Sequence, residues 1–188
     1  MHPDTQSDAQ PAGASPHPAR RSGRVLALFA AVAAATYALD VVTKLVAVAE
    51  LQDRPPVRVV GELLQLTLVR NPGAAFSTGT SYTLVLSMIA IAAVGVVLYV
   101  ARTLRDRLWA IGLGCLLGGV LGNLTDRLLR QPGPLRGHVI DWIELPNWPV
   151  FNVADMCINV AAAVIVVQAL RGVSLNGTRE PRRRGRAA

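Results

Sequence analysis

Residues 82–101 read YTLVLSMIAIAAVGVVLYVA, a run without a single charged side chain. A helix needs about 20 predominantly apolar residues to cross the hydrocarbon core of a bilayer. The run has that length, so we predict a transmembrane helix over residues 82–101. The whole chain agrees with a membrane protein, because 52% of its 188 residues are hydrophobic and only 16% are charged, against about 25% in an ordinary soluble domain.

Three further apolar runs flank this segment, at about residues 25–49, 108–126 and 153–170. The start of the first run, residues 25–39 after three arginines, also resembles a cleavable secretory signal. We favour one uncleaved helix, because the apolar pattern resumes after Asp40 and makes the segment long enough to span. The sequence therefore predicts an α-helical membrane protein with four transmembrane helices.

The distribution of Lys and Arg predicts the orientation of these helices. Twelve of the 19 lie in the N-terminal flank, in residues 102–107 and in the C-terminal tail, whereas six lie in the two longer loops, residues 50–81 and 127–152. Cytoplasmic loops are enriched in Lys and Arg. We therefore expect both termini in the cytoplasm and the two longer loops outside.

The net charge of +7 could also indicate a nucleic-acid-binding protein, since basic clusters neutralise phosphates. The arginines, however, lie beside the ends of the apolar runs, as they do in the cytoplasmic loops of membrane proteins. We therefore expect no nucleic-acid partner.

The remaining segments complete the predicted organisation. Residues 1–24 lack an apolar period and are expected to form a disordered cytoplasmic tail, and residues 171–188 an Arg-rich cytoplasmic tail. Between them, residues 25–170 form a single membrane domain. Imperfect alternation of apolar and polar residues over 57–69 predicts a small extracytoplasmic β-sheet, and a second short element is expected over residues 139–145.

Several ionisable residues lie within or beside the predicted spans, where such groups are costly and usually functional. Asp40 and Lys44 share a face of the first helix and can pair. The pair either only neutralises charge for insertion or also positions a substrate, and the two interpretations are compatible. Asn123 and Asp126 share a face of the third helix beside Arg127, which could equally be a polar helix end with a snorkelling arginine.

Two more aspartates, Asp141 and Asp155, precede and begin the fourth predicted helix, so carboxylates are available at one membrane surface. We expect no metal site, because only one histidine lies outside the N-terminal tail and no His-Glu-x-x-His helix occurs. A Ser–Lys mechanism would use Lys44, which Asp40 would keep charged. Paired carboxyl groups can act as acid and base towards water. The residues alone leave Asp126 and Asp141 as alternatives for one member of such a pair.

Five segments together resemble the signature segments of the lipoprotein signal peptidase (type II signal peptidase) family, in family order. They are DVVTK (40–44), RNPGAAFS (70–77), GNLTDR (122–127), VID (139–141) and FNVAD (151–155). The resemblance covers the chain from about Val25 to Leu170. It implies an aspartyl endopeptidase of the bacterial inner membrane that cleaves diacylglyceryl-modified prolipoproteins on the N-terminal side of the lipidated cysteine, without metal or organic cofactor.

The resemblance also implies roles for individual residues. The catalytic aspartates of the family map onto Asp141 and Asp155, at the extracytoplasmic face. Asp126 maps to a supporting position, where the adjacent Arg127 would favour its ionised form. Eight residues map to positions that bind substrate or order the site: Asp40, Lys44, Asn71, Gly73, Asn123, Asp126, Arg127 and Asn152.

Two departures from the family pattern are visible. Val41 stands where a glutamine is common, and the 14 residues from Asp141 to Asp155 form a short connection. The resemblance implies a short extracytoplasmic helix in this connection, and we expect that helix to be present but trimmed. The expected partners are lipid-modified prolipoproteins and membrane lipid, and the expected oligomeric state is a monomer.

A small four-span transporter or channel component, with intramembrane charges that form a relay, is the alternative function. It predicts polar residues distributed through the depth of the membrane. Apart from the Asp40–Lys44 pair, the polar residues of this chain gather at one predicted face. This distribution favours hydrolysis at the membrane surface.

Overall fold

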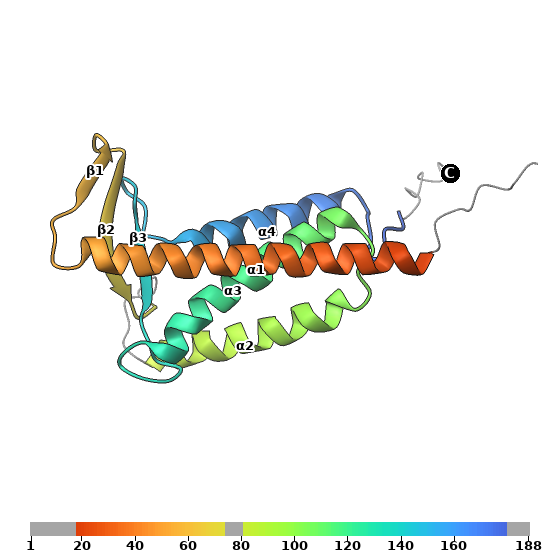
Figure 1. Cartoon of the computed structure of the whole chain (residues 1–188), viewed down its shortest axis with the longest axis horizontal. Coiled ribbons are helices and arrows are strands. Elements are labelled where there is room, and N and C mark those ends of the chain that lie inside the picture. Colours follow the sequence, from red (N-terminus) through yellow and green to blue (C-terminus); the bar gives the residue numbers. More distant parts are fainter. Residues whose placement is uncertain (1–17, 74–80, 180–188) are drawn as a thin grey trace, which may run out of the picture.

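The computed structural model describes residues 18–73 and 81–179. Within these residues, four long helices form a bundle with a three-stranded sheet at one end, here called the sheet end (Figure 1). Helix α1 begins, and helix α4 ends, at the opposite end of the bundle (Figure 1). The elements are α1 (Pro18–Leu51), β1 (Val57–Val60), β2 (Leu64–Asn71), α2 (Ser81–Ala101), α3 (Arg107–Leu129), β3 (Val139–Glu144) and α4 (Val153–Leu170).

The four helices coincide with the four predicted spans, and each is long and apolar enough to cross a membrane. The prediction of a four-helix membrane protein is confirmed. One boundary is wrong, because α1 begins at Pro18 and residues 18–24, assigned above to a disordered tail, are helical. Proline is favoured at the first position of a helix, and Ala and Arg are good helix formers. Residues 1–17 lie outside the described part of the chain.

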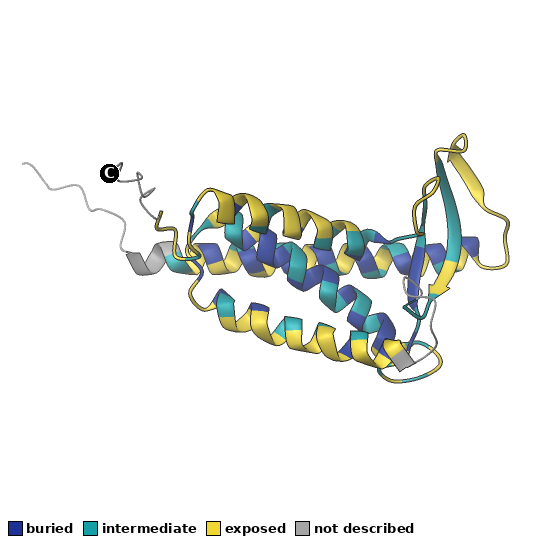
Figure 2. Ribbon diagram, turned by 180° about the vertical axis from the view of Figure 1, so that it is seen from behind, coloured by how far each residue is buried: buried dark blue, intermediate teal, exposed yellow. Residues whose placement is uncertain are grey.

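Helix α3 occupies the middle of the bundle. Half of its span is buried, compared with 17% of the spans of α2 and α4, whose outer faces are exposed (Figure 2). Glycines let α1 approach α3, since a Cβ on Gly118 would lie 2.5 Å from the carbonyl oxygen of Ala33. Such close backbone approach is typical of helix pairs in membranes.

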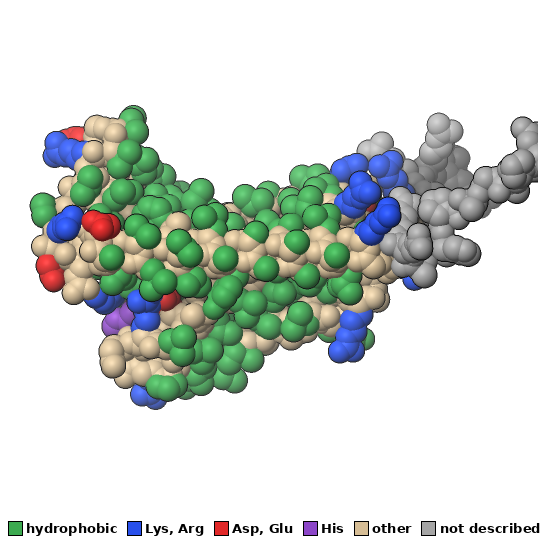
Figure 3. Space-filling view, viewed as in Figure 1, with side chains coloured by type: hydrophobic (Ala, Val, Ile, Leu, Met, Phe, Trp, Pro, Cys, Tyr) green, Lys and Arg blue, Asp and Glu red, His purple; other side chains and the backbone are tan. Residues whose placement is uncertain are grey.

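The surface between the two ends of the bundle is covered by hydrophobic side chains, while charged side chains gather at the ends (Figure 3). Large apolar residues of α2, for example Ile89 and Val96, are more than half exposed. A continuous apolar surface of this kind would be unfavourable in water but is matched by lipid. The surface therefore agrees with a bundle embedded in a bilayer.

The sheet is antiparallel with the order β1-β2-β3. The predicted sheet over residues 57–69 is confirmed, and the element expected over residues 139–145 is its third strand. In the register of β2 and β3, Val69 lies opposite Asp141 and Asn71 opposite Val139. This pairing brings Asp141 next to the end of β2, some 70 residues earlier in the sequence.

No helix lies between α3 and α4, in residues 130–152, all of which are described. The expectation of a short helix in this connection is therefore wrong. Between Asp141 and Asp155, residues up to Glu144 belong to β3, and Pro146 and Pro149 lack the backbone N–H that a helix interior needs. Apart from β3, the connection consists of turns and extended segments.

Candidate active site

The Asp40–Lys44 pair of α1 is buried where α1 faces α3. Lys44 Nζ lies 2.8 Å from Asp40 Oδ2, 3.0 Å from Asp126 Oδ2 and 2.8 Å from Asn123 Oδ1. The lysine is only 1% exposed. A buried cation is expensive unless it is paired and hydrogen-bonded. Lys44 meets this condition with two carboxylates and one amide, and it thereby ties α1 to α3.

Asp40 also fixes the start of α4. Its Oδ1 accepts a 2.8 Å hydrogen bond from the backbone N–H of Ala154 in the first turn of that helix. Carboxylates are favoured there, because the first N–H groups of a helix lack intrahelical partners. Gly122 of α3 makes room, since a Cβ on this glycine would lie 2.3 Å from Asp40 Oδ2. The pair therefore joins three helices, beyond neutralising its own charge.

Asp126 is bound by cations other than its sequence neighbour. Its carboxylate forms ion pairs with Lys44 and with Arg130, one turn later on α3, and accepts a 3.2 Å hydrogen bond from the backbone N–H of Ile140. Lys44 and Arg130 make the direct contacts with Asp126, and the neighbouring Arg127 interacts with it only through its charge. The i,i+4 spacing of Asp126 and Arg130 was the sequence signal for the second pair.

The side chain of Arg127 is buried, and its Nη1 has no hydrogen-bond partner within residues 18–73 and 81–179. Its charge interacts with those of Asp141, Asp126 and Asp155. Arg127 thus contributes positive charge to a region with several carboxylates.

Asp141 lies in β3 and is 2% exposed. Its Oδ2 accepts a 2.8 Å hydrogen bond from Asn71 Nδ2, and its Oδ1 accepts a 2.6 Å bond from Asn152 Nδ2. Burial raises the pKa of Asp141 to about 6; the hydrogen bond from Asn71 opposes this shift and the charge of Asp155 adds to it. Asp141 can therefore carry a proton at a higher pH than an ordinary aspartate.

Asp155 is half-buried in the first turn of α4. It forms a reciprocal capping box with Asn152: the Asp155 N–H donates to Asn152 Oδ1 at 3.0 Å, and Asp155 Oδ2 accepts from the Asn152 N–H at 3.2 Å. Asn123 Nδ2 donates to Asp155 Oδ1 at 2.9 Å. The carboxylate is therefore held by both α3 and the start of α4.

Asn71 is oriented by a tight turn at the end of β2. Its Oδ1 accepts a 2.8 Å hydrogen bond from the N–H of Gly73, the pattern of an Asx turn. Gly73 has a φ of 111°, and a Cβ there would lie 2.8 Å from Leu86 Cδ1. Glycine is favoured by the backbone conformation, whereas the flexible end of Leu86 could move to make room for a Cβ. Residues 74–77, the rest of this motif, lie outside the described residues.

The structure brings the predicted site residues together at the sheet end of the bundle, from α1, β2, α3, β3 and α4. Sequence reasoning missed four contributors. Ile140 and Ala154 contribute backbone N–H groups, which every non-proline residue has, so the sequence does not mark them. The role of Gly122 depends on how closely α1 packs against α3. Of the four, only Arg130 could have been predicted from the sequence, because it lies four residues after Asp126.

The arrangement offers two carboxyl groups in different surroundings, one deeply buried and one half-buried. Groups in such different environments can occupy different protonation states, which suits acid–base activation of water. Within residues 18–73 and 81–179, no group of three or more His, Cys, Asp or Glu side chains is placed to hold a metal ion.

Comparisons with known proteins identify the family of this chain. Residues 32–171 match the family model described as signal peptidase (SPase) II. A lipoprotein signal peptidase of Rhodococcus jostii (strain RHA1) is 44% identical over 177 residues, which cover 94% of this chain and 89% of that protein. A lipoprotein signal peptidase of Mycobacterium avium (strain 104) is 48% identical over 163 residues, covering 87% and 89%.

The fold also has a solved counterpart. A bacterial membrane enzyme whose structure was obtained by the in meso method superposes with a TM-score of 0.67 at 23% identity, over 79% of this chain and 94% of that one. At this identity the likeness concerns the fold alone. The match of the family model and the identity to the relatives decide the assignment: this chain belongs to the signal peptidase II family, and it is a peptidase.

Proposed function

We propose that this protein is an aspartyl endopeptidase that removes the signal peptide from diacylglyceryl-modified prolipoproteins, cutting on the N-terminal side of the lipidated cysteine. Its family and the relatives called lipoprotein signal peptidase support the substrate class. The observation that carries the aspartyl mechanism is the position of Asn152. Its Nδ2 donates to the Asp141 carboxylate and its Oδ1 accepts from the backbone N–H of Asp155, so one side chain contacts both aspartate residues.

In the proposed reaction, Asp141 is the acid and Asp155 the base. The raised pKa of Asp141 supports its role as the protonated member. Asp155 removes a proton from water, and the resulting hydroxide attacks the carbonyl carbon of the scissile bond. Asp141 then protonates the leaving nitrogen as the C–N bond breaks. Proton exchange returns the pair, which titrates as a unit, to its starting state.

Three asparagines would hold this pair in position. Asn71 and Asn152 donate to Asp141, and Asn123 donates to Asp155. Because the donors are themselves fixed by β2, α3 and the cap of α4, little reorganisation is needed during the reaction. Such preorganisation is a major source of catalytic power. Asp40, Lys44 and Asp126 would support the site by holding α1, α3 and β3 together.

We further propose that the sheet end faces the outside of the bacterial inner membrane, with both termini in the cytoplasm. The excess of Lys and Arg in the N-terminal flank, residues 102–107 and the C-terminal tail over the two longer loops, twelve against six, supports this orientation. The signal segment of the precursor would enter laterally from the bilayer, and the protein would act as a monomer.

The transporter alternative finds less support. It requires charged groups through the membrane depth, whereas the buried ion pairs of the described residues lie at the sheet end. At the opposite end, the buried Gln168 donates to Asp106, which caps the start of α3. A capping contact of this kind serves structure rather than transport.

The test is to reconstitute Asp141→Asn and Asp155→Asn variants in lipid vesicles with a diacylglyceryl-modified precursor. Each should lower kcat by about 10²–10⁴-fold, the contribution of a positioned acid or base. Asp53→Asn, an equal change of charge in an exposed turn, should cleave normally. Normal cleavage by a folded Asp141→Asn variant would falsify the proposed pair.

A further inference from the structure

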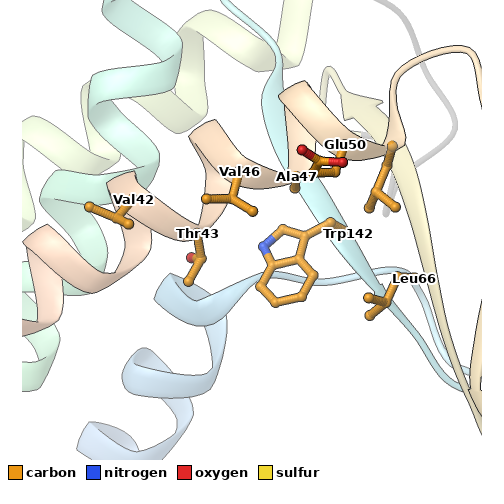
Figure 4. A pocket seen from close by; sticks show the side chains of 8 residues that line it. Val42, Thr43, Val46, Ala47, Glu50, Leu66 and Trp142 are labelled. Carbon is orange, nitrogen blue, oxygen red and sulfur yellow. The ribbon is translucent and has the colours of Figure 1, made fainter.

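A cavity of about 180 Å³ lies between the last turns of α1 and the sheet, next to the aspartate network but not part of it (Figure 4). Its wall is almost entirely apolar, formed by Val42, Val46, Ala47 and Leu51 of α1, Leu66 of β2 and Trp142 of β3. The polar exceptions are Thr43 and Glu50. None of these residues takes part in the mechanism proposed above.

The cavity opens towards lipid. Val42 and Val46 on its wall are each 55% exposed, and both lie in the first membrane span. The hydroxyl of Thr43 donates to the backbone carbonyls of Leu39 and Asp40, so its hydrogen is satisfied within α1. An occupant would therefore be an apolar group that arrives from the bilayer.

Trp142 adds an unpaired hydrogen-bond donor to this cavity. Its indole Nε1 is buried, yet within the described residues it has no hydrogen-bond partner. In Figure 4 the indole lies below α1, with its nitrogen on the side of Thr43. A buried indole N–H usually finds an acceptor, and leaving it unpaired is costly. The missing partner would be an oxygen on an otherwise apolar ligand.

We propose that this cavity binds an ester-linked acyl chain of the lipidated precursor, with the ester carbonyl accepting a hydrogen bond from Trp142 Nε1. The proposal rests on the proposed function for its substrate. An apolar cavity of roughly 150 Å³ holds a benzene molecule, so this one takes the first part of a chain, and the rest continues in the membrane.

The cavity lies close to Asp141, as the lipid of a bound precursor must. Trp142 follows Asp141 directly in β3, so their Cα atoms are about 3.8 Å apart. Successive side chains of a strand point to opposite faces, so the acyl chain and the Asp141 carboxylate do not compete for space. Because the lipidated cysteine adjoins the scissile bond, an ester held at Trp142 positions that bond near Asp141.

The experiment compares two precursor peptides, one with ester-linked and one with ether-linked chains, both carrying a reduced, uncleavable bond at the cleavage site. Binding is measured in nanodiscs of ether lipids. The unchanged protein should bind the ester peptide about tenfold more tightly, since only the ester offers a carbonyl. Trp142→Phe should bind both peptides equally. Trp148→Phe, at an indole that is 65% exposed, is the matched control and should keep the preference.

A second variant tests the cavity without altering the indole. Val46→Phe narrows the opening from an exposed position and should weaken binding of both lipidated peptides severalfold, while a peptide without acyl chains binds as before. Unchanged binding of the lipidated peptides to this variant would contradict the proposal.

The remaining outcomes separate the possible errors. An ester preference that persists in Trp142→Phe, or one that follows the nanodisc lipid when ester lipids replace ether lipids, overturns the assignment to the precursor. Binding is read without turnover, so it is independent of the chemistry. If the ester preference is found but a cleavable precursor remains intact, the proposed function fails and the acyl site stands.

Discussion

Asn152 Nδ2 lies 2.6 Å from Asp141 Oδ1, the shortest of the three contacts that this amide nitrogen makes. The Oδ1 atom of the same side chain accepts the N–H of Asp155. One asparagine thus begins α4 and also connects the two aspartates. The stability of the helix start and the geometry of the site are therefore coupled at a single residue.

This double role can be separated by substitution. Asn152→Ser keeps a good N-cap but loses the amide donor to Asp141, so thermal stability should change little while kcat falls. Asn152→Ala removes both functions and should also lose about 1 kcal/mol of stability. Thermal unfolding in detergent and precursor cleavage measure the two effects. Full activity in Asn152→Ser would show that the contact with Asp141 is dispensable.

The two candidate aspartates of α3 and β3 should respond differently to the same change. Asp126→Asn weakens the contacts with Lys44 and Arg130 and should cost about 1–3 kcal/mol of stability, with partial loss of cleavage. Asp141→Asn should lower kcat by about 10²–10⁴-fold without comparable unfolding. Thermal unfolding and cleavage assays on both variants distinguish them. An indispensable Asp126 with a dispensable Asp141 would reverse our assignment.

The raised pKa of Asp141 should be visible by infrared spectroscopy. A protonated carboxyl band is expected to disappear as the pH rises through about 6, and it should be missing in Asp141→Asn. Because the hydrogen bond from Asn71 lowers this pKa, Asn71→Ala should move the transition to higher pH. Asp53→Asn serves as the control. If the unchanged protein shows no carboxyl transition near pH 6, the raised pKa of Asp141 is contradicted.

The same shift affects stability in a direction opposite to that of most carboxylates. The folded protein binds the proton of Asp141 more tightly than the unfolded chain, whose reference pKa is 3.8. This contribution is present below pH 3.8 and is lost as the pH rises to about 6. The thermal midpoint of the wild type should therefore fall over this range relative to that of Asp141→Asn.

Because α1 and α3 are in close contact, we expect the stability of the protein to be sensitive to a substitution at Gly122. The added methyl group of Gly122→Ala would lie 2.3 Å from the Asp40 carboxylate, which Lys44 and Ala154 hold in place. Overpacking of this kind typically costs about 1–3 kcal/mol. Gly95→Ala in α2, with no atom within 4 Å of the new Cβ, should be neutral or stabilising. Equal thermal midpoints for the two variants would argue against the packing described here.

Much of this fold follows from local patterns. The apolar runs gave the four spans because crossing a bilayer demands a length and composition that a short segment carries by itself. Alternation over residues 57–69 predicted strands for the same reason. The failed prediction, a short helix between Asp141 and Asp155, concerned a connection that was judged from the family pattern rather than from its own prolines, Pro146 and Pro149.

The sequence by itself determined which chemical groups are available: several carboxylates, one lysine and a few amides in an apolar chain, together with the motifs that identify the family. Only the tertiary structure decided which of them meet. Lys44 reaches Asp126 because α1 packs closely on the glycines of α3, and Asp141 reaches Asn71 because two distant strands pair. Such contacts depend on helix packing and strand register, and on backbone groups that every residue shares, so no local pattern could reveal them.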